Sequence, residues 1–253
     1  MAVAHVAIEM GTARLNEMKD QPENYQSRVG ALRREKTRNR LLESALAVFA
    51  EKGPDAPMID DFIAAAGVAR GTFYNYFRTT GELLSAVAGE TSDEVLAVID
   101  PLVQQVDDPA HRVVVGSRLY MGMAKRYPLW GAFITRVGTR RGSRGRLLDE
   151  YLTRDLQTAI ESGRFRVGHL TVARDVALGS IVYGIETLLS GEAPEDYAEQ
   201  SMYALLQAFG LDEEEARAIA WAPIAECPEP QGLIFQRVRR QSEADAPPAD
   251  PLA

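Results

Sequence analysis

Hydrophobic residues recur at helical spacing through most of the chain, and no stretch sustains the apolar–polar alternation of a strand. The first clear example follows Arg33, where five apolar positions fall on one face of a helix: Leu41, Leu42, Ala45, Leu46 and Phe49. Gly53 and Pro54 end this helix, because glycine favours the C-terminal cap and proline cannot continue the turn. The pattern therefore predicts an all-α fold.

Three further helices are expected close behind the first. They cover Ile59–Ala65, Arg70–Tyr76 and a longer stretch from about Gly81 to Asp100. Beyond Pro101 the helical pattern continues, with breaks at glycine, proline and aspartate clusters. We place the remaining helices at Pro109–Tyr127, Trp130–Arg136, Gly145–Ser162, Val172–Ser190, Pro194–Phe209 and Glu213–Ala220.

The turn between the second and third helices carries the most information. It runs through Ala66-Gly67-Val68, where glycine accepts the positive φ that a tight turn needs. Phe73 and Phe77 are placed to pack the third helix onto the second, which leaves the polar side chains of the third helix facing outwards. This is the pattern of a helix-turn-helix, whose second helix enters the major groove of DNA.

The same residues resemble a known family. The run Ala66–Phe77 (AGVARGTFYNYF) is similar to the recognition segment of the TetR, or tetracycline-repressor, family. The resemblance extends upstream to the first helix and downstream to Glu82-Leu83-Leu84, about 50 residues in all. Three positions depart from the usual family residues, which are Thr, Ser and Lys where this chain has Met58, Ala69 and Thr80.

The resemblance implies a dimeric, ligand-responsive DNA-binding transcriptional regulator, usually a repressor, that binds a near-palindromic operator. Tyrosine hydroxyls would contact phosphates, and the Thr and Asn side chains would contact base edges or the DNA backbone. Tyr74 or Tyr76 could instead pack inwards, and the basic run before the first helix could be a solvated helix face. The expected DNA-binding residues are Arg38, Arg70, Gly71, Thr72, Tyr74, Asn75, Tyr76 and Thr80.

The family pattern also divides the chain. We expect a flexible, irregular arm at 1–30, with a short helix at about Ala7–Lys19 as the alternative. The three-helix helix-turn-helix domain is expected at 31–80 and a helical ligand-binding and dimerisation domain at 81–220. A partly disordered extension follows at 221–253, with a short extra element of unknown role at Gln231–Arg240.

The C-terminal helices are expected to hold a largely apolar small-molecule effector. Aromatic residues at helical spacing more often form an ordinary core than a ligand site, and both interpretations stay open. The candidate lining residues are Tyr120, Trp130, Phe133 and Tyr183. The homodimer is expected to pair through Val172–Ser190 and Pro194–Phe209, whose apolar faces contain Leu178, Ile181, Val182, Ile185, Leu188, Leu189, Met202, Leu205, Leu206 and Phe209.

Charge is unevenly distributed along the chain. The net charge is −8, yet residues 28–80 contain nine basic and six acidic residues and carry +3, which leaves −11 elsewhere. A basic head can meet phosphates while an acidic body is repelled by DNA. A second basic cluster spans Arg136–Arg146 and is interpreted either as a gate or acidic-ligand site beside a pocket, or as a solvated loop.

Other functions lack a recognisable motif. The single cysteine, Cys227, and three scattered histidines offer no metal-ligand spacing, and no nucleophile elbow or phosphate loop is present. We therefore expect no catalytic site, metal or cofactor, and no membrane segment. Cysteine usage fits a cytoplasmic protein. The competing hypothesis is an interaction module that keeps the fold but has weakened or lost DNA binding.

Overall fold

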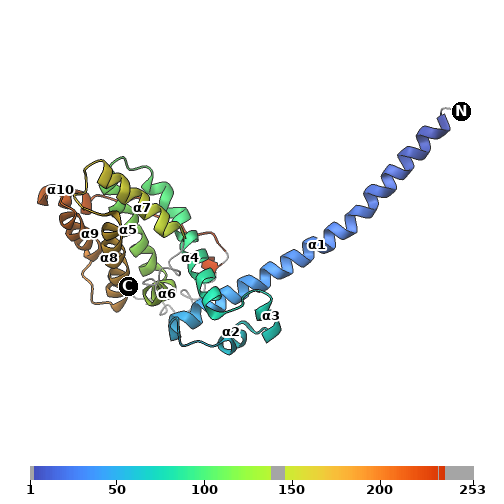
Figure 1. Cartoon of the computed structure of the whole chain (residues 1–253), viewed down its shortest axis with the longest axis horizontal. Helices are drawn as coiled ribbons and strands as arrows, with labels where there is room; N and C mark the ends of the chain where they lie inside the picture. Colours follow the sequence, from blue (N-terminus) through green and yellow to red (C-terminus); the bar gives the residue numbers. More distant parts are fainter. Residues whose placement is uncertain (1–2, 138–145, 233, 237–253) are drawn as a thin grey trace, which may run out of the picture. The chain divides into compact units, whose positions relative to one another are not determined.

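The computed structural model describes residues 3–137, 146–232 and 234–236, and within these ranges all regular secondary structure is helical (Figure 1). Contacts divide the chain into two compact units, Met1–Arg40 and Leu41–Ala253. The helices, in chain order, are α1 (Val3–Lys52), α2 (Ile59–Ala66), α3 (Arg70–Tyr74), α4 (Thr80–Val103), α5 (Pro109–Arg126), α6 (Pro128–Val137), α7 (Arg146–Glu161), α8 (Leu170–Ser190), α9 (Tyr197–Ala208) and α10 (Glu213–Ala220).

The first unit is a single stretch of helix, the N-terminal part of α1. Near its end the Thr37 hydroxyl donates to the carbonyl of Arg33 at 3.0 Å, one turn earlier. The expected irregular arm at 1–30 was wrong in its secondary structure, since α1 begins at Val3. Good helix formers such as Ala, Glu, Met and Leu dominate this stretch and outweigh its isolated glycine and proline. The expected flexibility of the arm stays a prediction.

The second unit begins with a small aromatic core that unites the end of α1 with α2 and α3. The rings of Phe49 and Phe62 lie 4.8 Å apart, and those of Phe62 and Phe73 lie 6.4 Å apart. All three side chains are fully buried, and Phe77 joins them. The predicted core positions of Phe73 and Phe77 are confirmed. This core fixes the angle at which α3 leaves the turn.

Helices α4–α10 form a bundle in which α5 packs against α4, α6, α7, α8 and α9. The long helix α4 belongs to both parts of the unit, because it starts beside α3 and ends among the helices of the bundle (Figure 1). Helix α6 approaches α5 closely at Gly131, where a Cβ atom would lie 2.7 Å from the carbonyl oxygen of Ala124 and 2.9 Å from Leu189. Only glycine permits this packing.

The apolar face that the sequence assigned to dimerisation proves to be intramolecular. The side chains of Leu178, Ile181, Val182, Ile185, Met202, Leu205, Leu206 and Phe209 are buried within the one chain, and Leu188 and Leu189 are partly buried. For the eight buried residues the assignment to a dimer interface was wrong, because they pack α8 and α9 onto the rest of the bundle. For Leu188 and Leu189, and for the pairing of the two helices, it stays a prediction. The exposed face of α8 presents Val172, Val176 and Tyr183.

Candidate DNA-binding surface and effector cavity

The turn before α3 depends on Gly67, which has φ +59° and ψ +45°. This left-handed conformation lets the amide of Val68 donate back to the carbonyl of Ile63 at 3.1 Å. Such a bond pattern terminates a helix and redirects the chain. The sequence-based prediction for Gly67 is confirmed, and a side chain here would strain the turn.

The helix N-termini around this turn are capped unequally. Asp61 accepts from the backbone amide of Met58 at 2.8 Å, but the Met58 side chain provides no cap for α2. Ala69 precedes α3 and provides no side-chain cap. Thr79 caps α4 by accepting from the amide of Glu82 at 3.0 Å. The recognition segment therefore depends on its aromatic packing more than on capping.

Most of the predicted DNA-contact residues face the solvent. The side chains of Arg70 and Asn75 are exposed, as is Gly71, and Tyr74 is 48% exposed. Thr72 and Thr80 are half-buried, while Tyr76 is partly buried against the core, so the inward-packing alternative applies in part to Tyr76. Arg38 is half-buried in the first unit, and the structure does not place it relative to α3.

Two ion pairs cross this surface. Arg70 Nη2 lies 2.5 Å from Asp60 Oδ1, and Lys52 Nζ lies 2.7 Å from Asp61 Oδ1. The hydrogen bond to Asp60 is the main reason why the pKa of Arg70 is raised, and Tyr74 contributes as a further partner. Arg70 is thus held beside Tyr74 as a full positive charge that faces the solvent. Such a surface is suited to a polyanion.

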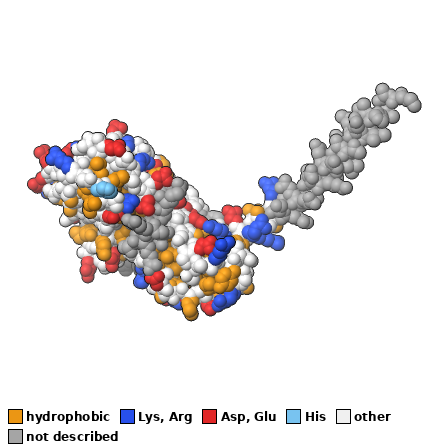
Figure 2. Space-filling view, viewed as in Figure 1, with side chains coloured by type: hydrophobic (Ala, Val, Ile, Leu, Met, Phe, Trp, Pro, Cys, Tyr) orange, Lys and Arg blue, Asp and Glu red, His pale blue; other side chains and the backbone are white. Residues whose placement is uncertain are grey.

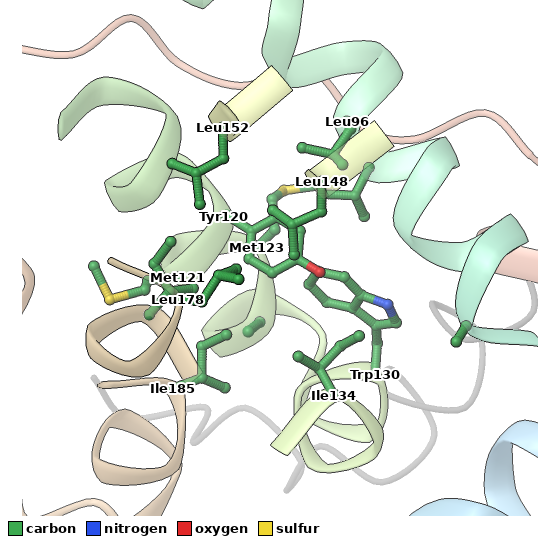
Figure 3. Packing of buried hydrophobic residues seen from close by; sticks show 14 of the residues in the cluster. Leu96, Tyr120, Met121, Met123, Trp130, Ile134, Leu148, Leu152, Leu178 and Ile185 are labelled. Atoms are coloured by element: carbon green, nitrogen blue, oxygen red, sulfur yellow. The ribbon is translucent and has the colours of Figure 1, made fainter. Parts of the chain in front are cut away.

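A cavity of about 40 Å³ lies within the bundle, between α4, α5, α7 and α8. This volume holds a few water molecules. The hydrophobic part of its wall includes Leu96, Val113, Leu148, Leu152 and Ile181. Figure 3 shows Leu96 from α4 and Leu148 and Leu152 from α7 converging on Tyr120, whose ring packs beside Trp130.

Polar groups reach the same cavity. Ser117 Oγ is buried without a hydrogen-bond partner among the described residues. The Tyr120 hydroxyl shares a 3.3 Å hydrogen bond with Ser92 Oγ, and burial raises the pKa of this phenol, which keeps it protonated. Asp155, 4% exposed, accepts two bonds from Arg154, which also binds Asp100 at 2.8 Å. An apolar cavity with a few convergent polar groups is the usual form of a small-molecule site.

The predicted effector-lining residues separate into three groups. Tyr120 lines the cavity. Trp130 and Phe133 are fully buried but belong to the packing behind it, with the Trp130 ring 5.0 Å from that of Tyr120. Tyr183 is 67% exposed, so its assignment to the lining was wrong because it lies on the outer face of α8. Sequence analysis missed Ser117 and Asp155, which no local pattern marks.

Other candidate chemistry is absent from what the structure describes. Across residues 3–137, 146–232 and 234–236, no group of three or more His, Cys, Asp or Glu side chains could hold a metal ion. None of the helices in those ranges is long and apolar enough to cross a membrane. Of the basic cluster, positions 140–144 lie outside the described residues. In the face drawn in Figure 2, acidic side chains are spread over the bundle.

The fold and the exposed α3 surface place the chain among helix-turn-helix proteins with a helical C-terminal domain. It belongs to the TetR family. Residues 41–87 match the family model described as bacterial regulatory proteins, tetR family, and residues 108–222 match the tetracyclin repressor-like C-terminal domain.

Solved structures support the same assignment. RolR in complex with resorcinol is 33% identical, with a TM-score of 0.63 over 78% of this chain and 100% of that chain. RolR without ligand is 31% identical, with a TM-score of 0.60 over 75% of this chain and 99% of that one. The regulator FadR of Bacillus subtilis, in complex with stearoyl-CoA, is 19% identical with a TM-score of 0.54 over 68% and 98% of the two chains, which shows the shared fold alone.

Curated relatives match over shorter spans. The HTH-type transcriptional regulator YvdT of Bacillus subtilis is 43% identical over 49 residues, 19% of this chain and 25% of YvdT. The HTH-type regulator Rv1255c of Mycobacterium tuberculosis is 26% identical over 107 residues, 42% of this chain and 53% of Rv1255c. The chain thus spans a quarter to about half the length of the curated relatives it matches.

Proposed function

We propose that this protein is a ligand-responsive transcriptional regulator that binds a near-palindromic operator as a homodimer and is released by a small molecule. The observation that carries this proposal is the exposed, polar α3 surface, with Arg70, Tyr74 and Asn75 outside and Phe73 inside. Arg and Tyr side chains at the end of such a helix fit phosphates, and Asn fits the edge of adenine. Repression is the outcome that this arrangement supports most simply, since bound protein obstructs transcription.

The second copy is proposed to pack on the exposed face of α8. Val172, Val176 and Tyr183 are 55%, 42% and 67% exposed, and the small residues Gly179 and Ser180 lie between them. A protomer rarely leaves such an apolar row in water unless a partner covers it. The Val176→Asp variant should sediment as a monomer, while Lys125→Gln, at an exposed position on α5, should remain a dimer. A dimeric Val176→Asp variant would place the interface elsewhere.

The proposed effector is a small aromatic molecule that carries hydroxyl groups. RolR, which is 33% identical, was crystallised with resorcinol. In this chain the unpartnered Ser117 Oγ, the Tyr120 hydroxyl and the Asp155 carboxylate offer hydrogen bonds within an apolar wall. Because the cavity holds only about 40 Å³, binding requires side chains to move apart. Such movement supplies a route by which a ligand could alter the bundle.

The test is DNA binding measured by fluorescence anisotropy, on sequences that the protein enriches from a random pool. Asn75→Ala should weaken binding to the enriched sequence about tenfold, because one base contact is worth on the order of 1–3 kcal/mol. Gln157→Ala removes an exposed amide from α7 in the bundle and should leave the affinity unchanged. If the wild-type protein enriches no sequence and shows no salt-sensitive binding, the proposal fails and the competing interaction-module hypothesis is favoured.

A further inference from the structure

The chain continues beyond the matched C-terminal domain, which ends at residue 222, into a segment that crosses the bundle. We name residues 223–232 and 234–236 the C-terminal strap. At its start, Arg118 on α5 donates to the carbonyls of Ala220 and Ala222 at 2.9 and 2.8 Å. Further along, Arg126 on α5 pairs with Glu229 at 2.5 Å. The strap is therefore attached to the last turn of α5, and the backbone just before the strap is attached to the middle of that helix.

The far end of the strap is buried like a core residue. Ile234 and Phe235 are 2% and 1% exposed. The Phe235 ring makes edge contacts with Tyr127 at 5.1 Å and with Trp130 on α6 at 5.5 Å. Burying these side chains removes a large apolar area from water and offsets the entropy of ordering the segment. The end of the strap is thus anchored by apolar packing against the bundle.

The docked end also contacts α4. The backbone amide of Phe235 donates to Glu94 Oε2 at 3.3 Å. Gly232 lies so close that an added Cβ atom would stand 1.8 Å from Glu94 Cδ. Figure 1 shows the turn at residues 234–236 beside α4. The strap therefore joins α4 to α6 through contacts on both helices.

Glu94 lies between two functional parts of α4. It lies between Thr80, where α4 leaves the helix-turn-helix, and the cavity residues Leu96, Ile99, Asp100 and Val103. Trp130, on the other side of the docked Phe235, packs against the cavity residue Tyr120. The strap thus contacts α4 at a point between the start of α4, next to the helix-turn-helix, and the cavity.

We propose that the C-terminal strap is a latch that fixes α4 against α6, and that strap docking and DNA binding favour each other. The part that concerns DNA rests on the proposed function. The docked strap restricts the tilt of α4 and so the position of α3. When the strap undocks, α4 is free to tilt, and the position of α3 relative to the bundle is no longer fixed.

The strap contains its own probe. Cys227 is the only cysteine in the sequence, and it lies half-buried on the strap. Its rate of reaction with Ellman's reagent on the full-length protein reports how often the strap opens. Phe235→Ala should react at least about tenfold faster than the wild type, because the anchor is gone. Glu226→Ala, at an exposed strap position, should react within about twofold of the wild type.

A second variant guards against a general loss of structure in Phe235→Ala. Gly232→Ala keeps both anchors but sets a methyl group against the Glu94 carboxylate, so it should also accelerate labelling while the helical circular dichroism stays unchanged. If both variants react at the wild-type rate, the strap is not a latch. If labelling accelerates only together with a loss of helix, the strap is part of the core and the inference is overturned.

The coupling to DNA is tested on the same proteins. Saturating enriched DNA should slow Cys227 labelling in the wild type. By linkage, Phe235→Ala should weaken DNA affinity to the extent that it lowers the fraction of protein with a docked strap. DNA binding with unchanged labelling would overturn the coupling and leave the proposed function intact. A wild-type protein that binds no DNA would overturn both.

Discussion

The helix-turn-helix and the bundle that follows it have the same kind of core but place their polar side chains differently. Both pack aromatic rings between helices, as Phe62 with Phe73 and Tyr120 with Trp130 show. In the helix-turn-helix the polar side chains point into solvent, whereas in the bundle Ser117 and Asp155 are enclosed. One region therefore offers surface to a large partner. The other encloses its polar groups, where only a small partner would fit.

The largest expected effect tests the core of the helix-turn-helix. Phe73→Ala removes a fully buried ring that contacts Phe62 and Phe77. It should lower the free energy of unfolding by about 3–5 kcal/mol, as measured by urea denaturation. Asn75→Ala, two residues away and exposed, should change it by less than about 0.5 kcal/mol. Similar losses in the two variants would mean that α3 has no separate inner and outer faces.

A smaller effect concerns the bundle and pH. Burial raises the pKa of Glu94 to about 7 from an ordinary value of 4.5, with Glu90 adding repulsion, although the amides of Phe235 and Ile234 oppose the shift. The folded state therefore binds this proton more tightly than the unfolded chain does. The resulting stability is complete below about pH 4.5 and is lost as the pH rises to about 7.

The melting temperature of the wild type should accordingly fall by a few degrees as the pH rises from about 5 to about 7. The Glu94→Gln variant should lose this dependence, because an amide does not titrate in that range. A melting temperature that falls equally in both proteins would assign the pH dependence to another group.

A third variant contrasts an enclosed polar group in the bundle with a half-buried one on α3. Ser117→Ala removes a buried hydroxyl without a described partner, so it should stabilise the ligand-free protein by about 1 kcal/mol. The same change should weaken binding of resorcinol, which isothermal titration calorimetry would measure if resorcinol binds the wild type. Thr72→Ala on α3 should not be stabilising. A destabilised Ser117→Ala variant would show that this hydroxyl is already satisfied.

The smallest expected effect is on the recognition surface. Asp60→Asn releases Arg70 from its ion pair and removes a negative charge beside the DNA. Exposed ion pairs contribute little, so DNA affinity should rise only about twofold. The slope of log affinity against log salt concentration should become steeper by at most about one for each helix-turn-helix bound. Anisotropy titrations at several salt concentrations measure both. Weaker binding would mean that Asp60 positions Arg70 for its contact.

The all-helical architecture, the turn at Gly67 and the inward positions of Phe73 and Phe77 could be predicted, because one-sided helices and a positive φ leave local patterns in the sequence. The face of α8 could not, since this helix is apolar almost all round: Ile181 and Ile185 pack inwards, while Val176 and Tyr183 lie outside. Periodicity cannot rank two apolar faces.

The cavity and the docking of the strap were hidden for a different reason, although a short element at Gln231–Arg240 was predicted and the structure has a helical turn at 234–236. Ser117 and Asp155 meet only after α5 and α7 pack, and Phe235 meets Glu94 across 141 positions of sequence. A single aromatic residue in a polar, proline-containing tail has no periodic neighbours to mark it as buried. Such contacts depend on tertiary packing and not on local propensity.

The length of α4 has a mechanical consequence. Its 24 residues form a rod of about 36 Å at 1.5 Å per residue. A tilt of about 5° at one end displaces the other by roughly 3 Å, more than a hydrogen bond tolerates. A small tilt of α4 at the cavity would thus become a displacement of several ångströms at the helix-turn-helix. A ligand that binds with modest affinity could therefore still have a large effect on DNA binding.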